Sequence, residues 1–145
     1  FSVWRKAAKV YRMAIALKPD NPVSYFNLGN VINQSGHHAE AAPRFLEAKE
    51  REPVGSEDWA KATAAAFDLL KLDVCAEVAK PEWWNDEELK ALSARVVRAA
   101  PDDGLAYQMR AIVLGGQCGG AWAVGPRSAA ELMEAATHYE RAAAL

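Results

Sequence analysis

Apolar side chains recur at spacings of three and four residues along most of the chain, which is the period of an amphipathic helix. In residues 1–17 the recurring positions are Val3, Ala7, Val10, Tyr11, Ala14 and Leu17. The same spacing predicts helices within residues 22–53, over 56–70, 85–100 and 104–114, and from 128 onward. The abundance of alanine and the scarcity of isoleucine and threonine favour helix over strand. The pattern therefore predicts an all-α protein.

Start and stop residues support this prediction. Three of the stretches begin with residues that commonly cap helices, at Ser56, Asn85 and Ser128. Two of these caps have a glutamate three residues later, Glu88 and Glu131, which is the spacing of a capping box. Helices are expected to end before Pro19, Pro53 and Pro101, because proline cannot continue the hydrogen-bond ladder inside a helix.

The chain also contains an internal repeat. Four residues have counterparts 34 positions later: Ala7 and Ala41, Tyr11 and Phe45, Ala14 and Ala48, Pro19 and Pro53. Between the two prolines lies Tyr25-x2-Leu28-Gly29-x2-Ile32. This segment resembles the first-helix half of a tetratricopeptide repeat, W-x2-L-G-x2-Y, with conservative changes at both ends. Residues 22–55 are therefore similar to one complete repeat of that family.

The resemblance implies a right-handed superhelical stack of antiparallel helix pairs, formed by residues 1–145 as a single solenoid segment. Residues 1–21 would be the second helix of a truncated repeat, and residues 22–55 the complete repeat. Residues 56–103 would be a repeat with an inserted turn at 71–84, and residues 104–145 a repeat with an inserted glycine-rich turn at 115–127. Because both ends fall inside helical patterns, we expect the chain to be a fragment of a longer polypeptide.

For function, the resemblance implies a non-catalytic scaffold or adaptor that binds an extended peptide or a neighbouring subunit. In this family the first helix of each pair lines a concave groove. The groove residues that the resemblance implies are Phe26, Asn27, Asn30, Asn33, Gln34, Lys61, Ala64, Phe67, Asp68 and Gln108, with Asn27 and Lys61 taken from the ligand-clamp positions of the family. Amide side chains can bond both the N–H and the C=O of a peptide backbone. The alternative is that this face is solvated or covered by a neighbouring part of the same protein.

One well-defined groove of this family, the carboxylate clamp for the C-terminal acid of chaperones, does not fit the sequence. The clamp needs several cations around one anion. In one register Asn27 and Lys61 fall on clamp positions, but Glu57 stands where a lysine is required. In the other register Asn30 matches and Phe26 stands in the lysine position. Neither register gives a working clamp.

The two inserted turns carry Trp83, Trp84 and Trp122, and both turns are expected to project from the same edge of the stack. Tryptophan is enriched among interface anchors, which makes these residues candidate partner contacts. They would then fix the chain as a structural subunit within a large multiprotein assembly. The competing interpretation is that the tryptophans fold back and cover the widened gap between their own helices.

Composition excludes several other classes of function. A net charge of −2 and a pI near 5.9 disfavour nucleic acid, and no apolar run is long enough for a direct membrane span. Cys75 and Cys118 lie far apart, and His37-His38 has no third ligand nearby, so neither a disulfide nor a metal site is predicted. No catalytic motif is present, so we expect no enzyme activity, no cofactor and no small-molecule substrate. The sequence leaves the cellular compartment open.

Overall fold

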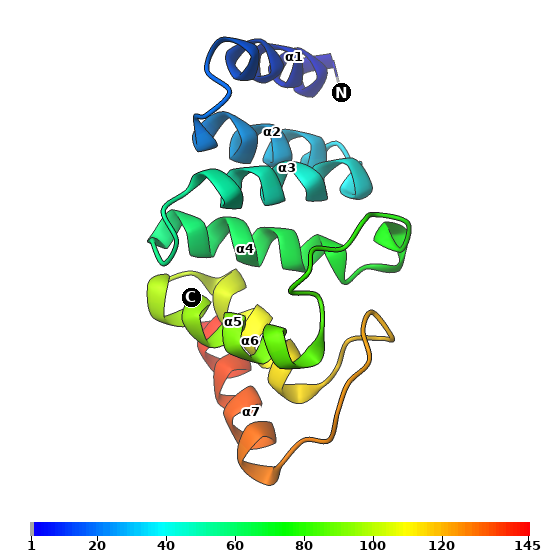
Figure 1. Ribbon diagram of the computed structural model, residues 1–145, viewed down its shortest axis with the longest axis vertical. Coiled ribbons are helices and arrows are strands. Elements are labelled where there is room, and N and C mark those ends of the chain that lie inside the picture. Colours follow the sequence, from blue (N-terminus) through cyan, green and yellow to red (C-terminus); the bar gives the residue numbers. More distant parts are fainter. Residues whose placement is uncertain (1) are drawn as a thin grey trace.

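A computed structural model describes residues 2–145, which form seven α-helices, one short 3-10 helix and no strand (Figure 1). The helices are α1 (Ser2–Leu17), α2 (Pro22–Gln34), α3 (His38–Arg51), α4 (Glu57–Leu70), α5 (Asp86–Ala99), α6 (Gly104–Gly115) and α7 (Ala129–Ala144), and the 3-10 helix is η1 (Asp73–Cys75). The predicted all-α stack is confirmed. Figure 1 shows the helices following one another along the long axis, from α1 at one end to α7 at the other.

The residues that begin and end these helices are those expected from the sequence. Side-chain oxygens of Ser56, Asn85 and Ser128 accept hydrogen bonds from backbone N–H groups three residues later, at 3.1, 3.0 and 3.1 Å. Ser128 and Glu131 form a complete capping box, whereas the box predicted at Asn85 and Glu88 forms only its first half. Helices α1, α3 and α5 each end two residues before a proline.

The first part of the stack is held by close approaches between neighbouring helices. Helix α2 packs against both α1 and α3, and α3 packs against α4. A Cβ added to Gly29 would lie 2.9 Å from the ring of Phe45, so the glycine is what allows α2 and α3 to approach. Ala41 and Ala48 on α3 are fully buried in the same region.

The second part of the stack departs from this regular pairing. Helix α4 packs against α6 as well as α5, and η1, in the first inserted turn, packs against α3. A second apolar core lies here, with Trp59, Phe67, Leu89, Val96 and Met109 among its buried members. Figure 1 shows the two inserted turns on the same side of the stack.

Candidate functional site

A pocket between α2 and α4 is the candidate functional site, and we call it the α2–α4 pocket. It has a volume of about 170 Å³ and is lined by Val23, Phe26, Asn27, Ala48, Glu52, Asp58, Lys61 and Ala62. Val23 and Asn27 are one helical turn apart on α2, and Asp58 and Ala62 are one turn apart on α4, so each pair shares a helix face. Glu52, which caps the C-terminus of α3, supplies a third wall.

Three of the predicted groove residues meet in this pocket: Phe26, Asn27 and Lys61. The ring of Phe26 packs edge-on against the buried ring of Phe45, with centroids 5.3 Å apart, and so has a defined position. Phe26 and Asn27 are both partly exposed. The pocket therefore has one apolar and one amide group from α2 within reach of a ligand.

Other predicted groove residues are placed differently. Ala64 and Phe67 are each only 1% exposed and belong to the core, so the prediction that they line an open groove is wrong. Asn33, near the end of α2, is hydrogen-bonded to His38, the first residue of α3. Asp68 forms an ion pair with Lys71, with 3.3 Å between Oδ1 and Nζ. Three other predicted groove residues, Asn30, Gln34 and Gln108, are exposed but do not line the pocket.

Charge in and around the pocket is dominated by carboxylates. Lys61 Nζ lies 2.9 Å from Glu57 Oε1, and this hydrogen bond raises the pKa of Lys61. Burial, followed by the nearby charge of Asp58, raises the pKa of Glu52. The pKa of Asp103 is also raised, mainly by burial. These raised pKa values mean that the folded chain disfavours the charged forms of Glu52 and Asp103, mainly because burial removes water from them.

The tryptophans of the inserted turns point into the protein. The rings of Phe67, Trp84 and Trp122 pack against one another, with centroids 5.5 to 5.8 Å apart. Trp84 Nε1 donates to the Ala121 carbonyl at 3.1 Å, and Trp122 Nε1 donates to Asp86 Oδ1 at 3.0 Å. Trp122 is only 7% exposed, so the prediction that it is a partner contact is wrong, and the competing interpretation, that it covers the gap between the helices, describes it correctly. Trp84 is partly buried, and a role for it as a partner contact stays a prediction.

Trp83, like Trp84, is only partly buried, and its ring lies beside Trp84 and under Lys49, whose Nζ is 5.4 Å from the ring centroid. Lys49 Nζ is equally close to the ring of Trp59, and burial lowers the pKa of this lysine. A role for Trp83 as a partner contact stays a prediction.

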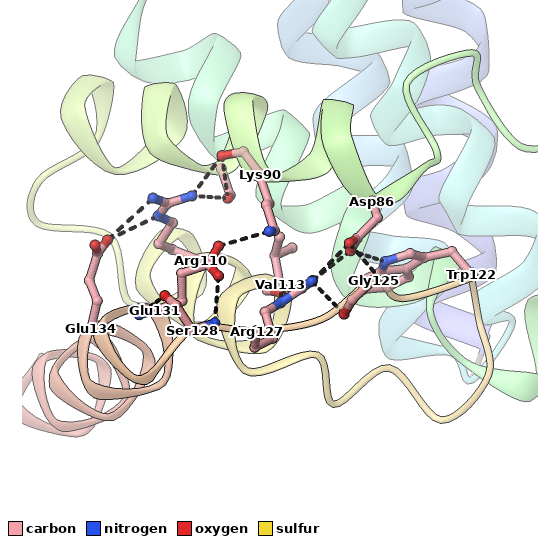
Figure 2. A network of polar contacts seen from close by, with 11 residues as sticks. Asp86, Lys90, Arg110, Val113, Trp122, Gly125, Arg127, Ser128, Glu131 and Glu134 are labelled. Atoms are coloured by element: carbon pink, nitrogen blue, oxygen red, sulfur yellow. Dashed lines mark hydrogen bonds and ion pairs between the residues drawn. The ribbon is translucent and has the colours of Figure 1, made fainter.

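A salt bridge between Asp86 and Arg127 fastens both inserted turns, and we call it the turn clasp (Figure 2). Arg127 donates to both carboxylate oxygens of Asp86, to the Val113 carbonyl at 2.8 Å and to the Gly125 carbonyl at 3.0 Å. Asp86 also accepts from Gly125 N at 2.9 Å and from the indole of Trp122. The hydrogen bonds from Arg127 hold the pKa of Asp86 well below its ordinary range.

A second polar network joins α5, α6 and α7 beside the turn clasp (Figure 2). Lys90 Nζ lies 2.8 Å from Glu131 Oε2, and this contact is the main reason that the pKa of Glu131 is lowered to about 2. Arg110 donates to the Lys90 carbonyl at 2.6 Å and to Ser93 Oγ at 3.1 Å, and pairs with Glu134 at 3.3 Å. These charges have partners inside the chain, so this network is structural.

Neither a cluster of possible metal ligands nor a helix that could span a membrane is found in residues 2–145. No group of three or more His, Cys, Asp or Glu side chains in that range could hold a metal ion. Cys75 and Cys118 are buried free thiols, and burial raises the pKa of Cys75. None of the described helices is long and apolar enough to cross a membrane.

Comparison with known proteins identifies the repeat. A family model described as "TPR repeat" matches residues 4–36, which include most of α1 and all of α2. No curated protein matches the chain. Repeats of this kind generally mediate protein–protein interactions and are typically non-catalytic. Residues 4–36 thus match a tetratricopeptide repeat, and the all-α stack of packed helices is consistent with a solenoid of that kind.

Proposed function

We propose that the chain is a non-catalytic adaptor that binds an extended peptide segment of a protein partner in the α2–α4 pocket. The observation that carries the proposal is the meeting of Phe26, Asn27 and Lys61, from two different helices, in one open pocket. An amide at the wall can donate to and accept from a peptide backbone, while the phenyl ring contacts an apolar side chain.

The size of the pocket supports a peptide over a small molecule. Its volume of about 170 Å³ is below the roughly 300–1,000 Å³ of typical small-molecule sites. It is close to the roughly 150 Å³ of an engineered protein cavity that binds benzene. The α2–α4 pocket is therefore large enough for one apolar side chain, which is what a peptide anchored at a single residue needs.

The proposal keeps the predicted division of the chain. Residues 22–55, which contain α2 and α3, act as the complete repeat, and residues 1–21 as the second helix of the repeat before it. Residues 56–103 and 104–145 are repeats with inserted turns at 71–84 and 115–127. The packing of α2 on α3 and of α6 on α7 as helix pairs supports this division.

Paired substitutions test the proposed site. Val23→Ser with Asn27→Ala changes the pocket, and Val74→Ser with Asn30→Ala makes the same chemical changes at exposed positions outside it. Short random peptides, displayed in many copies on phage, are selected on the unchanged chain and then tested on both variants. We expect the pocket variant to lose about tenfold in affinity, because burying a valine-sized side chain contributes about 1.5 kcal/mol. Equal binding to all three proteins would show that the pocket is not the site.

A second candidate, a structural subunit held within a large assembly, is favoured by one observation on α1. This helix exposes an apolar stripe formed by Val3, Val10, Met13 and Leu17, which are 58 to 83% exposed. Exposed apolar patches of this kind commonly mark interfaces. Val10→Glu with Met13→Glu should release the chain from such an assembly on size-exclusion chromatography while peptide binding persists. Continued co-migration of the variant with high-mass material would exclude this face.

A further inference from the structure

The α2–α4 pocket contains two carboxylates that have no partner cation. Glu52 and Asp58 both line it, and neither forms an ion pair within residues 2–145. The one ammonium group that lines the pocket, Lys61, is already paired with Glu57 at 2.9 Å. The charge left over in the pocket is therefore negative.

The neighbouring cation is directed away from these carboxylates. Arg51 is adjacent to Glu52 in sequence, but its Nε donates to the Pro19 carbonyl at 2.8 Å and its Nη1 to the Glu47 carbonyl at 2.9 Å. Its guanidinium also lies over the ring of Tyr25, 4.2 Å from the centroid. The raised pKa of Glu52, caused by burial and by the charge of Asp58, agrees with this lack of compensation.

Apart from Asn27 and Lys61, the rest of the pocket lining is apolar. The side chain of Val23 is 55% exposed, and the ring of Phe26 and the methyl groups of Ala48 and Ala62 complete the apolar lining. A ligand that matches this surface must present an apolar group and a positive charge close together. A peptide does so when a lysine or arginine lies next to an apolar residue.

We infer that the α2–α4 pocket selects a basic peptide segment, in which one apolar side chain enters the pocket and an adjacent lysine or arginine contacts Glu52 and Asp58. This inference rests on the proposed function and adds the chemistry of the partner. It is the opposite of an acidic C-terminal tail, whose carboxylates would meet the negative charge of the pocket. The cation neutralises two like charges that the folded chain otherwise holds near each other.

The test compares three fluorescent peptides that share one backbone: leucine flanked by lysines, leucine flanked by glutamates, and serine flanked by lysines. Binding to the full chain is followed by fluorescence anisotropy at low and at high salt. We expect the lysine-flanked leucine to bind about tenfold more tightly than either other peptide at low salt. Its advantage over the glutamate-flanked peptide should shrink as salt screens the charges.

Charge-neutral variants assign the preference to the pocket. Glu52→Gln with Asp58→Asn should reduce the preference for lysine over glutamate to about threefold or less. Glu77→Gln with Glu140→Gln removes the same charge from exposed positions outside the pocket and should leave the preference unchanged. If both variants lose the preference equally, it comes from the net charge of the chain, and if both keep it, the pocket carboxylates are not its source; either result would show that the inference is wrong.

The phage selection separates this inference from the proposed function. If the selected peptides depend on Val23 and Asn27 but carry no excess of cations, peptide binding in the pocket stands and the basic preference falls. If none of the selected peptides depends on these two residues, both proposals fall. Selected peptides that depend on them and place a cation beside an apolar residue support both.

Discussion

Replacing Arg127 with methionine tests whether the turn clasp stabilises the second part of the stack. The side chain of Arg127 is 6% exposed and that of Asp86 is 18% exposed, so the substitution leaves a largely buried carboxylate without its cation. Breaking a buried ion pair in this way typically costs about 3–5 kcal/mol. Asp86 keeps the N–H donors of Trp122 and Gly125, which places the expected loss near the lower end, at about 3 kcal/mol.

Urea unfolding followed by tryptophan fluorescence and by circular dichroism measures this loss. Trp59, Trp83, Trp84 and Trp122 all lie in or against one apolar cluster, so the fluorescence signal reports mainly on the second part of the stack. The melting temperature should fall by roughly 6–12 °C, since about 1 kcal/mol shifts it by 2–4 °C in domains of about this size. Because neighbouring units of a solenoid can unfold separately, we expect the fluorescence midpoint to move at least as far as the helical signal.

Two further variants decide whether the effect belongs to the pair. Arg98→Met removes an exposed arginine from α5 and should change the free energy of unfolding by less than about 0.5 kcal/mol. Asp86→Asn combined with Arg127→Met should cost less than the sum of the two single changes, because the two side chains are in contact. A loss of under about 1 kcal/mol for Arg127→Met alone would refute the reasoning.

Three other substitutions or conditions give equally definite expectations. Gly29→Ala should lower the free energy of unfolding in urea by about 1–2 kcal/mol, because the overlap of the new Cβ with the buried Phe45 ring outweighs the gain in helix propensity. As a control, Gly104→Ala should be neutral or stabilising, because its Cβ would meet nothing closer than 3.8 Å. Phe67→Ala should cost about 3–5 kcal/mol and shift tryptophan emission to the red, and an unchanged unfolding midpoint would show that the aromatic cluster is loosely packed. The folded-state pKa of Asp86 is depressed, so its contribution to the free energy of unfolding is present above the ordinary pKa of 3.8 and is lost as the pH falls towards the lowered pKa. The free energy of unfolding should therefore fall less steeply with decreasing pH in Asp86→Asn than in the unchanged chain.

Local signals were sufficient to predict the helices and the regular part of the stack. Helix ends depend on nearby residues, and α1, α3 and α5 all end two residues before Pro19, Pro53 and Pro101. The contact between Gly29 and Phe45 was also predictable, because a sequence repeat fixes which small and large residues face each other across a helix pair.

Contacts made by the inserted turns could not be predicted in the same way. Asp86 and Arg127 are 41 residues apart, and no repeat or local motif relates them. Helical periodicity placed Phe67 on the inner face of α4 but could not show that Trp84 and Trp122 cover it. Periodicity gives the face of a helix on which a residue lies, whereas burial depends on which other segments reach that face.

Closure of the inner face around Phe67 limits how tightly a short peptide can bind. Only three of the predicted groove residues line the α2–α4 pocket: Phe26 and Asn27 on α2, and Lys61 on α4. The pocket holds one side chain, so a peptide has one anchor there. One buried apolar side chain contributes about 1.5–3 kcal/mol, and two partly exposed charge pairs add at most about 2 kcal/mol. The total of at most about 5 kcal/mol is near the roughly 4.1 kcal/mol of a millimolar dissociation constant, before any cost of ordering the peptide. We therefore expect single peptides to bind at millimolar level and the partner to reach useful affinity through several linked contacts. A short monomeric peptide that bound at nanomolar concentration would require contacts beyond this pocket and would contradict the single-anchor mechanism.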